Sequence, residues 1–205
     1  MILSSTQTKR FGADLNRQLA SFARSASQLQ RDLRHLKQND VLEGLTKFVA
    51  AVNSRQEAFS TLMSLNAAIG SNVSEAERTK ALIDLSDHKG GSAAYDFLEG
   101  ETAIKKAVEG FDGNRVLLSR AASYSQVKAA EDAGDKALAK KLEENSWLFA
   151  GAHHALESLS RQAESIASAQ WAIVHGQGLH FWQGRQKWFR YVGDDRPATY
   201  DCVAS

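Results

Sequence analysis

Residues 135–175 decide the fold class, and they read DKALAKKLEENSWLFAGAHHALESLSRQAESIASAQWAIVH. A stripe of positions recurs there in alternating steps of four and three, and nine of its eleven members are apolar: Leu138, Leu142, Asn145, Phe149, Ala152, Leu156, Leu159, Ala163, Ile166, Gln170 and Ile173. This spacing lines one face of a helix. With Asp135 as N-cap, the stretch predicts one helix to His175, roughly 60 Å long. Its apolar face needs cover from other long helices or from a second copy.

The first 70 residues predict two more long helices. The same alternation runs from Leu15 to Leu36 and predicts a helix over residues 8–37. The polar residues 38–40 interrupt it, and we expect Asp40 to cap the next helix, with Glu43 three residues later completing a capping box. The second stripe, from Val41 to Ile69, holds two polar members, Arg55 and Asn66. Residues 8–70 therefore predict an antiparallel helical hairpin.

Glycines divide the middle of the chain, residues 71–133, into shorter segments. They stand at Gly70, Gly90, Gly91, Gly100, Gly110, Gly113 and Gly134. Because glycine weakens a helix interior and favours turns, the sequence predicts three short helices, over residues 75–88, 92–109 and 114–133. Ser74 and Glu77 have the spacing of a capping box at the start of the first of these.

The character of the sequence changes after Gly176. Residues 179–192 read LHFWQGRQKWFRYV, an aromatic segment with Gly184 where a tight β-turn favours glycine. It predicts a two-stranded hairpin, followed by an irregular arm over residues 193–205. The predicted fold class is all-α: an elongated bundle of coiled-coil-like long helices over residues 1–175, of which 135–175 form the third long helix, and a C-terminal hairpin and arm over residues 176–205.

Composition excludes several classes of protein. The chain has 205 residues, 25 Lys and Arg against 24 Asp and Glu, and 43% apolar residues, which is typical of an ordinary soluble domain without a general attraction for nucleic acid. One cysteine, Cys202, excludes an internal disulfide and a cysteine-based zinc site. Residues 1–10 lack the apolar core of a signal peptide, and no segment reaches the roughly 20 apolar residues of a membrane span. We therefore expect a cytoplasmic protein or a component within a macromolecular assembly.

Four arginines recur every seven residues along the first predicted helix: Arg10, Arg17, Arg24 and Arg31. They fall opposite the apolar stripe, and we call them the arginine face. Residues 1–38 carry seven Lys or Arg against two Asp, a net charge of +5. Because guanidinium groups bind carboxylates and phosphates through paired hydrogen bonds, this face is a candidate binding surface for an acidic partner, phosphate or anionic lipid. The alternative is a solvated face that only keeps the protein soluble.

The predicted hairpin is a second candidate partner-binding surface. Its aromatic and basic residues include Phe181, Trp182, Trp188, Phe189, Arg190 and Tyr191. Trp, Tyr and Arg are frequent hot spots of protein interfaces, and the same mixture can stack on bases or lie among lipid headgroups. The alternative is that these rings only cap one end of the bundle.

Two weaker motifs remain. The last four residues, Cys202 to Ser205, fit a prenylation signal, but acidic rather than basic residues precede them. His153, His154 and Glu157 lie within one helical turn but lack the spacing of a zinc motif, so we interpret them as surface residues. The sequence predicts no catalytic residue, no metal site and no cofactor.

These patterns together favour a structural or assembly protein. We expect it to oligomerise through its long heptad-patterned helices within a larger complex, such as a virion or a secretion assembly, and to dock neighbours through its C-terminal hairpin and arm. Its partners would be further copies of itself and other protein subunits, and no small-molecule substrate is inferred. The alternative is a membrane-surface protein that uses the arginine face and the hairpin, with Cys202 prenylated. An enzyme, with a site where His180 and Arg190 meet the bundle, is the least favoured class.

Overall fold

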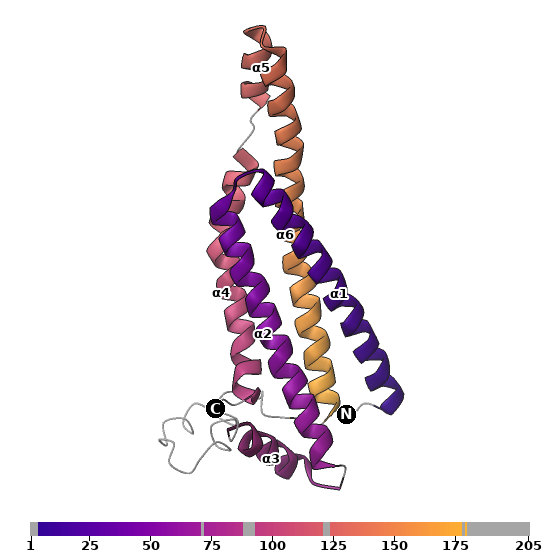
Figure 1. The fold of residues 1–205 in the computed structure, drawn as a ribbon. Helices are drawn as coiled ribbons and strands as arrows, with labels where there is room; N and C mark the ends of the chain where they lie inside the picture. The colour runs from indigo at the N-terminus through magenta and orange to yellow at the C-terminus, as the bar shows by residue number, and fades with distance from the viewer. Residues whose placement is uncertain (1–3, 71, 88–92, 121–123, 178, 180–205) are drawn as a thin grey trace, which may run out of the picture. The chain divides into compact units, whose positions relative to one another are not determined.

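The structure is a computed structural model that describes residues 4–70, 72–87, 93–120, 124–177 and 179. Within these ranges it is all-helical, with no strand. Figure 1 shows the six helices, which are α1 (Ser5–His35), α2 (Asn39–Ile69), α3 (Glu75–Asp87), α4 (Ala93–Arg120), α5 (Tyr124–Asp132) and α6 (Lys136–Gly176). The predicted all-α fold is thus confirmed for the described residues. The predicted hairpin and arm, residues 180–205, lie outside them.

The three predicted long helices are present with nearly the expected bounds. Their stripes are buried almost throughout: Leu15, Phe22, Ala26, Leu29 and Leu33 of α1; Val41, Leu45, Phe48, Val52, Arg55, Phe59, Leu62 and Asn66 of α2; and Phe149, Ala152, Leu156, Leu159, Ala163, Ile166, Gln170 and Ile173 of α6. The other described members are less covered: Leu19 and Leu36 of α1, Ile69 of α2 and Leu142 of α6 are half-buried, and Leu138, the first member of the α6 stripe, is 45% exposed. The heptad pattern therefore identified the buried face of each long helix.

Capping explains several helix ends. The Leu138 N–H donates to Asp135 Oδ1 (3.0 Å), and the Ser74 N–H donates to a Glu77 carboxylate oxygen (3.0 Å), so both predicted caps are confirmed. The prediction for Asp40 was wrong. Helix α2 begins at Asn39, which places Asp40 inside its first turn, and Glu43 pairs with Lys47 (2.6 Å). The Leu42 N–H bonds to the Gln38 carbonyl (2.9 Å), so the helix starts one to two residues earlier than expected.

The predicted break between residues 92–109 and 114–133 was also wrong. Helix α4 runs without interruption from Ala93 to Arg120, through three glycines, and α5 is a separate helix of nine residues. Each glycine costs a helix only about 1 kcal/mol relative to alanine, which tertiary packing can offset. One of them, Gly100, packs against Arg55: a Cβ atom at Gly100 would lie 2.8 Å from the Arg55 Cβ. This glycine permits close approach of two helices and does not mark a turn.

The chain forms two compact units. The first unit comprises residues 1–16, 51–103 and 166–205, and the second comprises residues 17–50 and 104–165. Helices α1, α2, α4 and α6 each contribute to both units, whereas α3 belongs to the first and α5 to the second.

Aromatic rings form the centre of the second unit. Phe48 of α2 makes edge contacts with Phe22 of α1 and Phe111 of α4, at centroid distances of 5.7 and 5.4 Å. Phe22, Phe48 and Phe111 are at most 2% exposed. Leu156 and Leu159 of α6 are fully buried in the same unit, so four helices cover this core.

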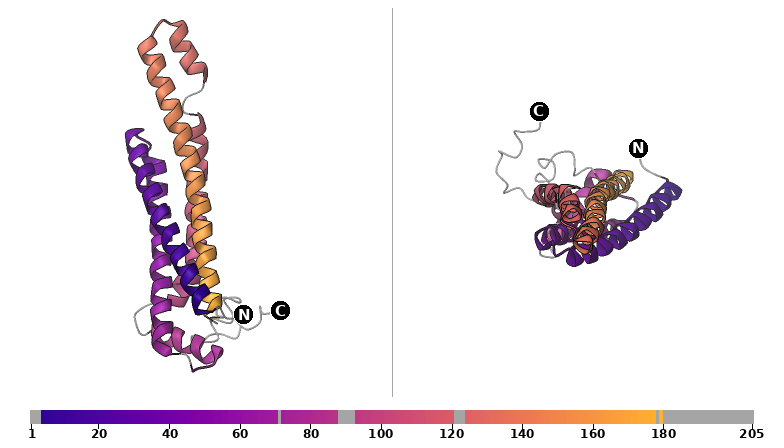
Figure 2. Two further views of the ribbon diagram at one scale, coloured as in Figure 1. Left: turned by 90° about the vertical axis from the view of Figure 1, so that its right-hand side faces the viewer. Right: turned by 90° about the horizontal axis from the view of Figure 1, so that it is seen from above.

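The core of the first unit is mixed. Phe97 of α4 packs against Phe59 of α2 and Trp171 of α6, at centroid distances of 6.1 and 5.2 Å. Arg55 and Gln170, two polar stripe members, are buried in the same unit at 1% and 0% exposure. Figure 2 shows the end of α6 beside α2 in this part of the molecule.

Candidate functional site

The arginine face lies on α1, opposite the buried stripe. Arg10, in the first unit, and Arg17, Arg24 and Arg31, in the second, are all exposed. A spacing of seven residues places successive arginines roughly 10 Å apart along one side of a helix. The predicted exposure of this face is therefore confirmed, whereas its role in binding stays a prediction.

Local hydrogen bonds orient two of these arginines. Arg24 Nε donates to the Ala20 carbonyl (3.3 Å), and Arg31 Nη2 donates to Gln28 Oε1 (2.6 Å). Gln28 Nε2 in turn donates to Asp32 Oδ1 (2.8 Å). Each guanidinium has five N–H groups, so most of the donors of Arg24 and Arg31 stay available to an acceptor outside the chain.

A shallow groove of about 750 Å³ runs beside Arg24 and Arg31 in the second unit. Its other lining residues are mostly small or polar: Ala23, Ser25, Ser27, Gln28, Leu29, Asp32 and Ala155. All but Ala155 come from α1, and Ala155 is on α6. Small side chains beneath two arginines allow another chain to approach α1 closely while its acceptors meet the guanidinium groups.

Arg55 is the most unusual side chain of the first unit. It is 1% exposed, its Nε donates to Gln170 Oε1 (2.8 Å), and Gln170 Nε2 donates to Gln56 Oε1 (2.8 Å). The Arg55 guanidinium stacks over Phe97, with Cζ 4.4 Å from the ring centroid. Glu101, at 4.0 Å from Nη1, supplies the opposite charge. The two Nη atoms of Arg55 make no hydrogen bond.

The environment of Arg55 opposes its charge. Loss of water lowers the pKa of Arg55 to about 10, and the charge of Glu101 acts in the opposite direction. Because this pKa is still well above neutral, the guanidinium stays charged at pH 7. A buried cation held by rings and one distant carboxylate is a structural feature of the core, since only 1% of Arg55 is exposed.

The sequence predicted that Arg55 and Gln170 lie in the apolar stripes of their helices. It did not predict that their side chains contact each other. The two residues are 115 positions apart, on α2 and α6. A signal was present, because each is a polar residue in an otherwise apolar stripe, and such residues often set the register of packed helices. The pattern of one helix, however, carries no information on which neighbour its polar member faces.

A second polar cluster joins three helices of the first unit. Asn66 Nδ2 of α2 donates to Gln177 Oε1, which follows α6, over 3.1 Å. Arg78 of α3 donates from Nη2 to the Gly70 carbonyl (2.9 Å) and from Nη1 to Asn66 Oδ1 (3.5 Å). These bonds join α3 to the end of α2, and the end of α2 to the residue that follows α6, a structural role for the second polar stripe member.

The histidine pair on α6 lies at the surface of the second unit. The rings of His153 and His154 lie 5.6 Å apart, and Glu157 pairs with Arg161 and lies 4.0 Å from His154. The residues that the structure describes contain no group of three or more His, Cys, Asp or Glu side chains arranged to hold a metal ion. The interpretation of these histidines as surface residues agrees with the partial exposure of His153 and the exposure of His154.

The remaining predicted site residues fall outside the described ranges. They are His180, Phe181, Trp182, Trp188, Phe189, Arg190, Tyr191 and Cys202. Their assignment to partner binding, lipidation or catalysis stays a prediction.

One further finding concerns membranes. Among the described helices, none combines the length and the apolar character needed to cross a bilayer.

Comparisons with protein families, with curated proteins and with solved structures found no match for this chain. Its candidate function therefore depends on the geometry of its own surfaces.

Proposed function

We propose that this chain is a structural subunit that assembles with protein neighbours through the arginine face of α1. The observation that carries the proposal is the exposure of Arg17, Arg24 and Arg31 at seven-residue intervals, with Arg24 and Arg31 above a groove of about 750 Å³. A partner helix with carboxylates at the same seven-residue spacing would meet these arginines in register. Bidentate guanidinium–carboxylate pairs would supply both orientation and specificity.

The burial of the stripes supports an outer contact surface. Most stripe residues of α1, α2 and α6 are buried within the chain, so they are not free to pair with a neighbour. Assembly then has to use the outer faces of the helices. On the outer face of α1, exposed arginines recur at intervals of seven residues.

The observations favour a protein partner over a membrane. A helix that lies in a lipid surface exposes an apolar face together with its basic residues. The large apolar residues of α1, including Leu15, Phe22, Leu29 and Leu33, are buried in the bundle. The exposed large apolar residues among those described, Val73, Tyr95, Leu138 and Leu148, lie outside α1.

Charge reversal on the arginine face tests the proposal. We expect the tagged chain, purified from its native source with chemical crosslinking, to bring down a partner in fixed stoichiometry, and the double variant Arg24→Glu/Arg31→Glu to lose it. The matched control is Lys47→Glu/Lys106→Glu, which reverses two exposed lysines on α2 and α4. Circular dichroism should show the same helix content in all three proteins.

Two results would contradict the proposal. One is the absence of any stoichiometric partner, and the other is a partner that the arginine variant retains. Sedimentation with anionic vesicles separates the membrane alternative: binding that falls at high salt and disappears in Arg24→Glu/Arg31→Glu would assign the face to lipid.

A further inference from the structure

A groove of about 480 Å³ lies in the first unit, where the start of α1, the second half of α2 and the end of α6 meet. Its apolar lining residues include Leu15, Phe59 and Ile173, which are buried, and Met63 and Ala67, which are half-buried and exposed. A volume of this size holds a drug-sized ligand or two aromatic side chains.

Gly12 of α1 lines the same groove. A Cβ atom at Gly12 would meet nothing within 4 Å, although the residue is half-buried. The other described glycines inside helices with the same open space, Gly110 and Gly151, are exposed. Glycine costs a helix about 1 kcal/mol relative to alanine, and no described neighbour requires it here. The open side of Gly12 therefore indicates room for an occupant of the groove.

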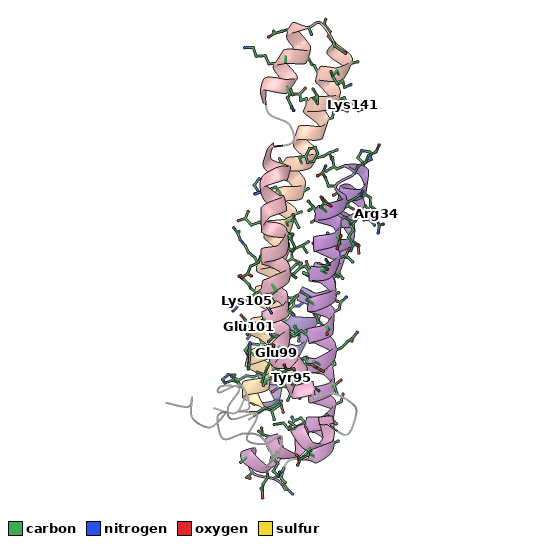
Figure 3. The ribbon with its side chains drawn as sticks, turned by 90° about the vertical axis from the view of Figure 1, so that its left-hand side faces the viewer. Arg34, Tyr95, Glu99, Glu101, Lys105 and Lys141 are labelled. Atoms are coloured by element: carbon green, nitrogen blue, oxygen red, sulfur yellow. The ribbon has the colours of Figure 1, made fainter. Side chains whose placement is uncertain are left out.

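The groove is uncharged. None of the described residues that line it is acidic or basic, and its polar groups are hydroxyls and amides. One of these, Asn66, is 7% exposed and donates to Oε1 of Gln177, which also lines the groove (3.1 Å). Figure 3 shows the acidic residues Glu99 and Glu101 on α4, which contributes no lining residue. Because an unpaired charge is costly to bury, the groove favours an uncharged aromatic occupant.

The chain leaves α6 at the edge of this groove. Gln177, the residue after α6, lines it. Leu179 is fully buried, and its N–H donates to the Val174 carbonyl (3.2 Å), which holds the chain against the end of α6. Residues 180–192, which follow, lie outside the described ranges and read HFWQGRQKWFRYV. Phe181 is four residues beyond Gln177, which is at most roughly 14 Å of chain.

The sequence of this segment indicates which of its sides suits the groove. Successive side chains of an extended segment alternate between two sides, so Phe181 shares the side of the buried Leu179. With Gly184 at the turn, the predicted hairpin pairs Phe181 with Trp188, and paired residues share one face. Trp182 falls on the opposite face. The rings expected to point toward the bundle are therefore those of Phe181 and Trp188.

We propose that residues 180–192 occupy the groove of their own chain, with Phe181 and Trp188 against its apolar lining. The lengths agree, because the lining residues of α2 run from Gln56 to Ala67, roughly 16 Å, and a strand of five residues spans about the same distance. A segment tethered this close to its site has an effective concentration in the millimolar range, which favours it over a second copy. The groove is a surface other than the arginine face, so the inference goes beyond the proposed function.

Photocrosslinking in the full-length protein tests where the segment lies. With Trp188→p-benzoylphenylalanine, we expect crosslinks within one chain to residues 8–16 or 56–67, and Met63 should be the preferred site because benzophenones react readily at methionine. Trp182→p-benzoylphenylalanine is the matched control, and it should lose these crosslinks. Crosslinks that join two chains, or an absence of crosslinks to these residues, would overturn the proposal.

A side chain placed in the groove should displace the segment. Gly12→Leu fills the open space without a clash at Cβ. We expect the amide hydrogens of residues 180–192 to exchange at least about 10-fold faster in this variant than in the wild type. The matched control is Gly151→Leu, which has the same open space in the second unit and should leave this exchange unchanged. Circular dichroism should show equal helix content in all three proteins.

A second pair of variants leaves the described helices untouched. Phe181→Ala/Trp188→Ala should speed exchange in the segment by a similar factor, whereas Trp182→Ala should not. If residues 180–192 of the wild type exchange as fast as a free peptide of the same sequence, the segment does not occupy the groove and the proposal fails. Protection that survives either Gly12→Leu or Phe181→Ala/Trp188→Ala also refutes it, because the segment would then be held elsewhere.

Discussion

The two units use the same helices but fill their cores differently. All the polar residues that are buried among the described positions, Arg55, Asn66, Thr79 and Gln170, belong to the first unit. The second unit has a core of Phe22, Phe48 and Phe111 with the leucines around them. One heptad pattern thus supports two kinds of core. An apolar core supplies stability, whereas buried polar pairs reduce stability but fix which positions of two helices lie opposite each other.

The largest expected effect is the loss of an apolar ring from the second unit. Phe48→Ala removes the ring that contacts both Phe22 and Phe111, and the free energy of unfolding should fall by about 3–5 kcal/mol. Urea denaturation followed by circular dichroism measures this change. A loss below about 2 kcal/mol would mean that the second unit collapses around the cavity, and its core would then not be the tightly packed one described.

A pair of glycine variants should give effects of opposite sign. Gly100→Ala places a Cβ 2.8 Å from the Arg55 Cβ, and the resulting overpacking should lower the free energy of unfolding by about 1–3 kcal/mol. Gly151→Ala, in the second unit, meets nothing within 4 Å and should raise it by up to about 1 kcal/mol through helix propensity. Thermal and urea denaturation of both variants check the prediction. If both variants are stabilised, α4 does not approach Arg55 as closely as the structure shows.

Replacement of the buried cation should have a smaller effect than its burial suggests. Arg55→Met keeps most of the side-chain volume and removes a charge whose pKa desolvation has lowered to about 10, but it also removes the bond to Gln170 and the stacking on Phe97. These terms oppose each other, so the free energy of unfolding should change by less than about 1 kcal/mol.

Arg55→Ala is the control for this comparison. It leaves a cavity and should cost about 2–5 kcal/mol. If Arg55→Met is as destabilising as Arg55→Ala, the buried charge itself stabilises the first unit. The polar residues of that core would then add to stability as well as fix which positions of two helices lie opposite each other.

The smallest expected effect is a change of pKa at the start of α3. Hydrogen bonds from the Ser74 side chain and N–H lower the pKa of Glu77. Because the folded state favours the charged carboxylate, this stabilisation is present above the ordinary pKa of glutamate and is lost as the pH falls through the lowered value. Ser74→Ala should raise the pKa of Glu77, measured by NMR titration. The pKa of Glu43, which Lys47 lowers, should not change, and an unmoved Glu77 would contradict the capping box.

Local sequence predicted well what depends on neighbours in the chain. Asp135 and Ser74 cap helices because an oxygen three residues before an unpaired N–H can reach it whatever the rest of the fold does. By contrast, the chain leaves α1 at Lys37, a non-glycine residue with a φ of 56°, and α2 begins two residues later, at Asn39. The sequence does not show that Lys37 adopts this conformation, so it did not show where the turn between α1 and α2 lies. Asp40 was therefore wrongly predicted to cap α2.

Glycine was the least informative signal taken alone. Gly134 ends α5 at a positive φ, as its usual role predicts, but Gly100 and Gly110 lie inside α4. The difference lies in the partner. Gly100 is opposite Arg55 of α2, and a residue with no side chain lets the two helices approach there. The sequence of residues 93–120 does not contain that partner, so it could not separate a turn from a close contact.

The sequence by itself determined the all-α fold, the three long helices, the face that each one buries and the exposed arginines on α1. Each of these follows from the periodicity of one helix, which is a local property. Only the tertiary structure decided that Arg55 meets Gln170, that α4 is continuous, and that the stripe of α6 is covered from Phe149 onward and exposed at Leu138. These depend on which helices lie opposite each other, and a periodic pattern states that a face needs a partner without stating which partner covers it.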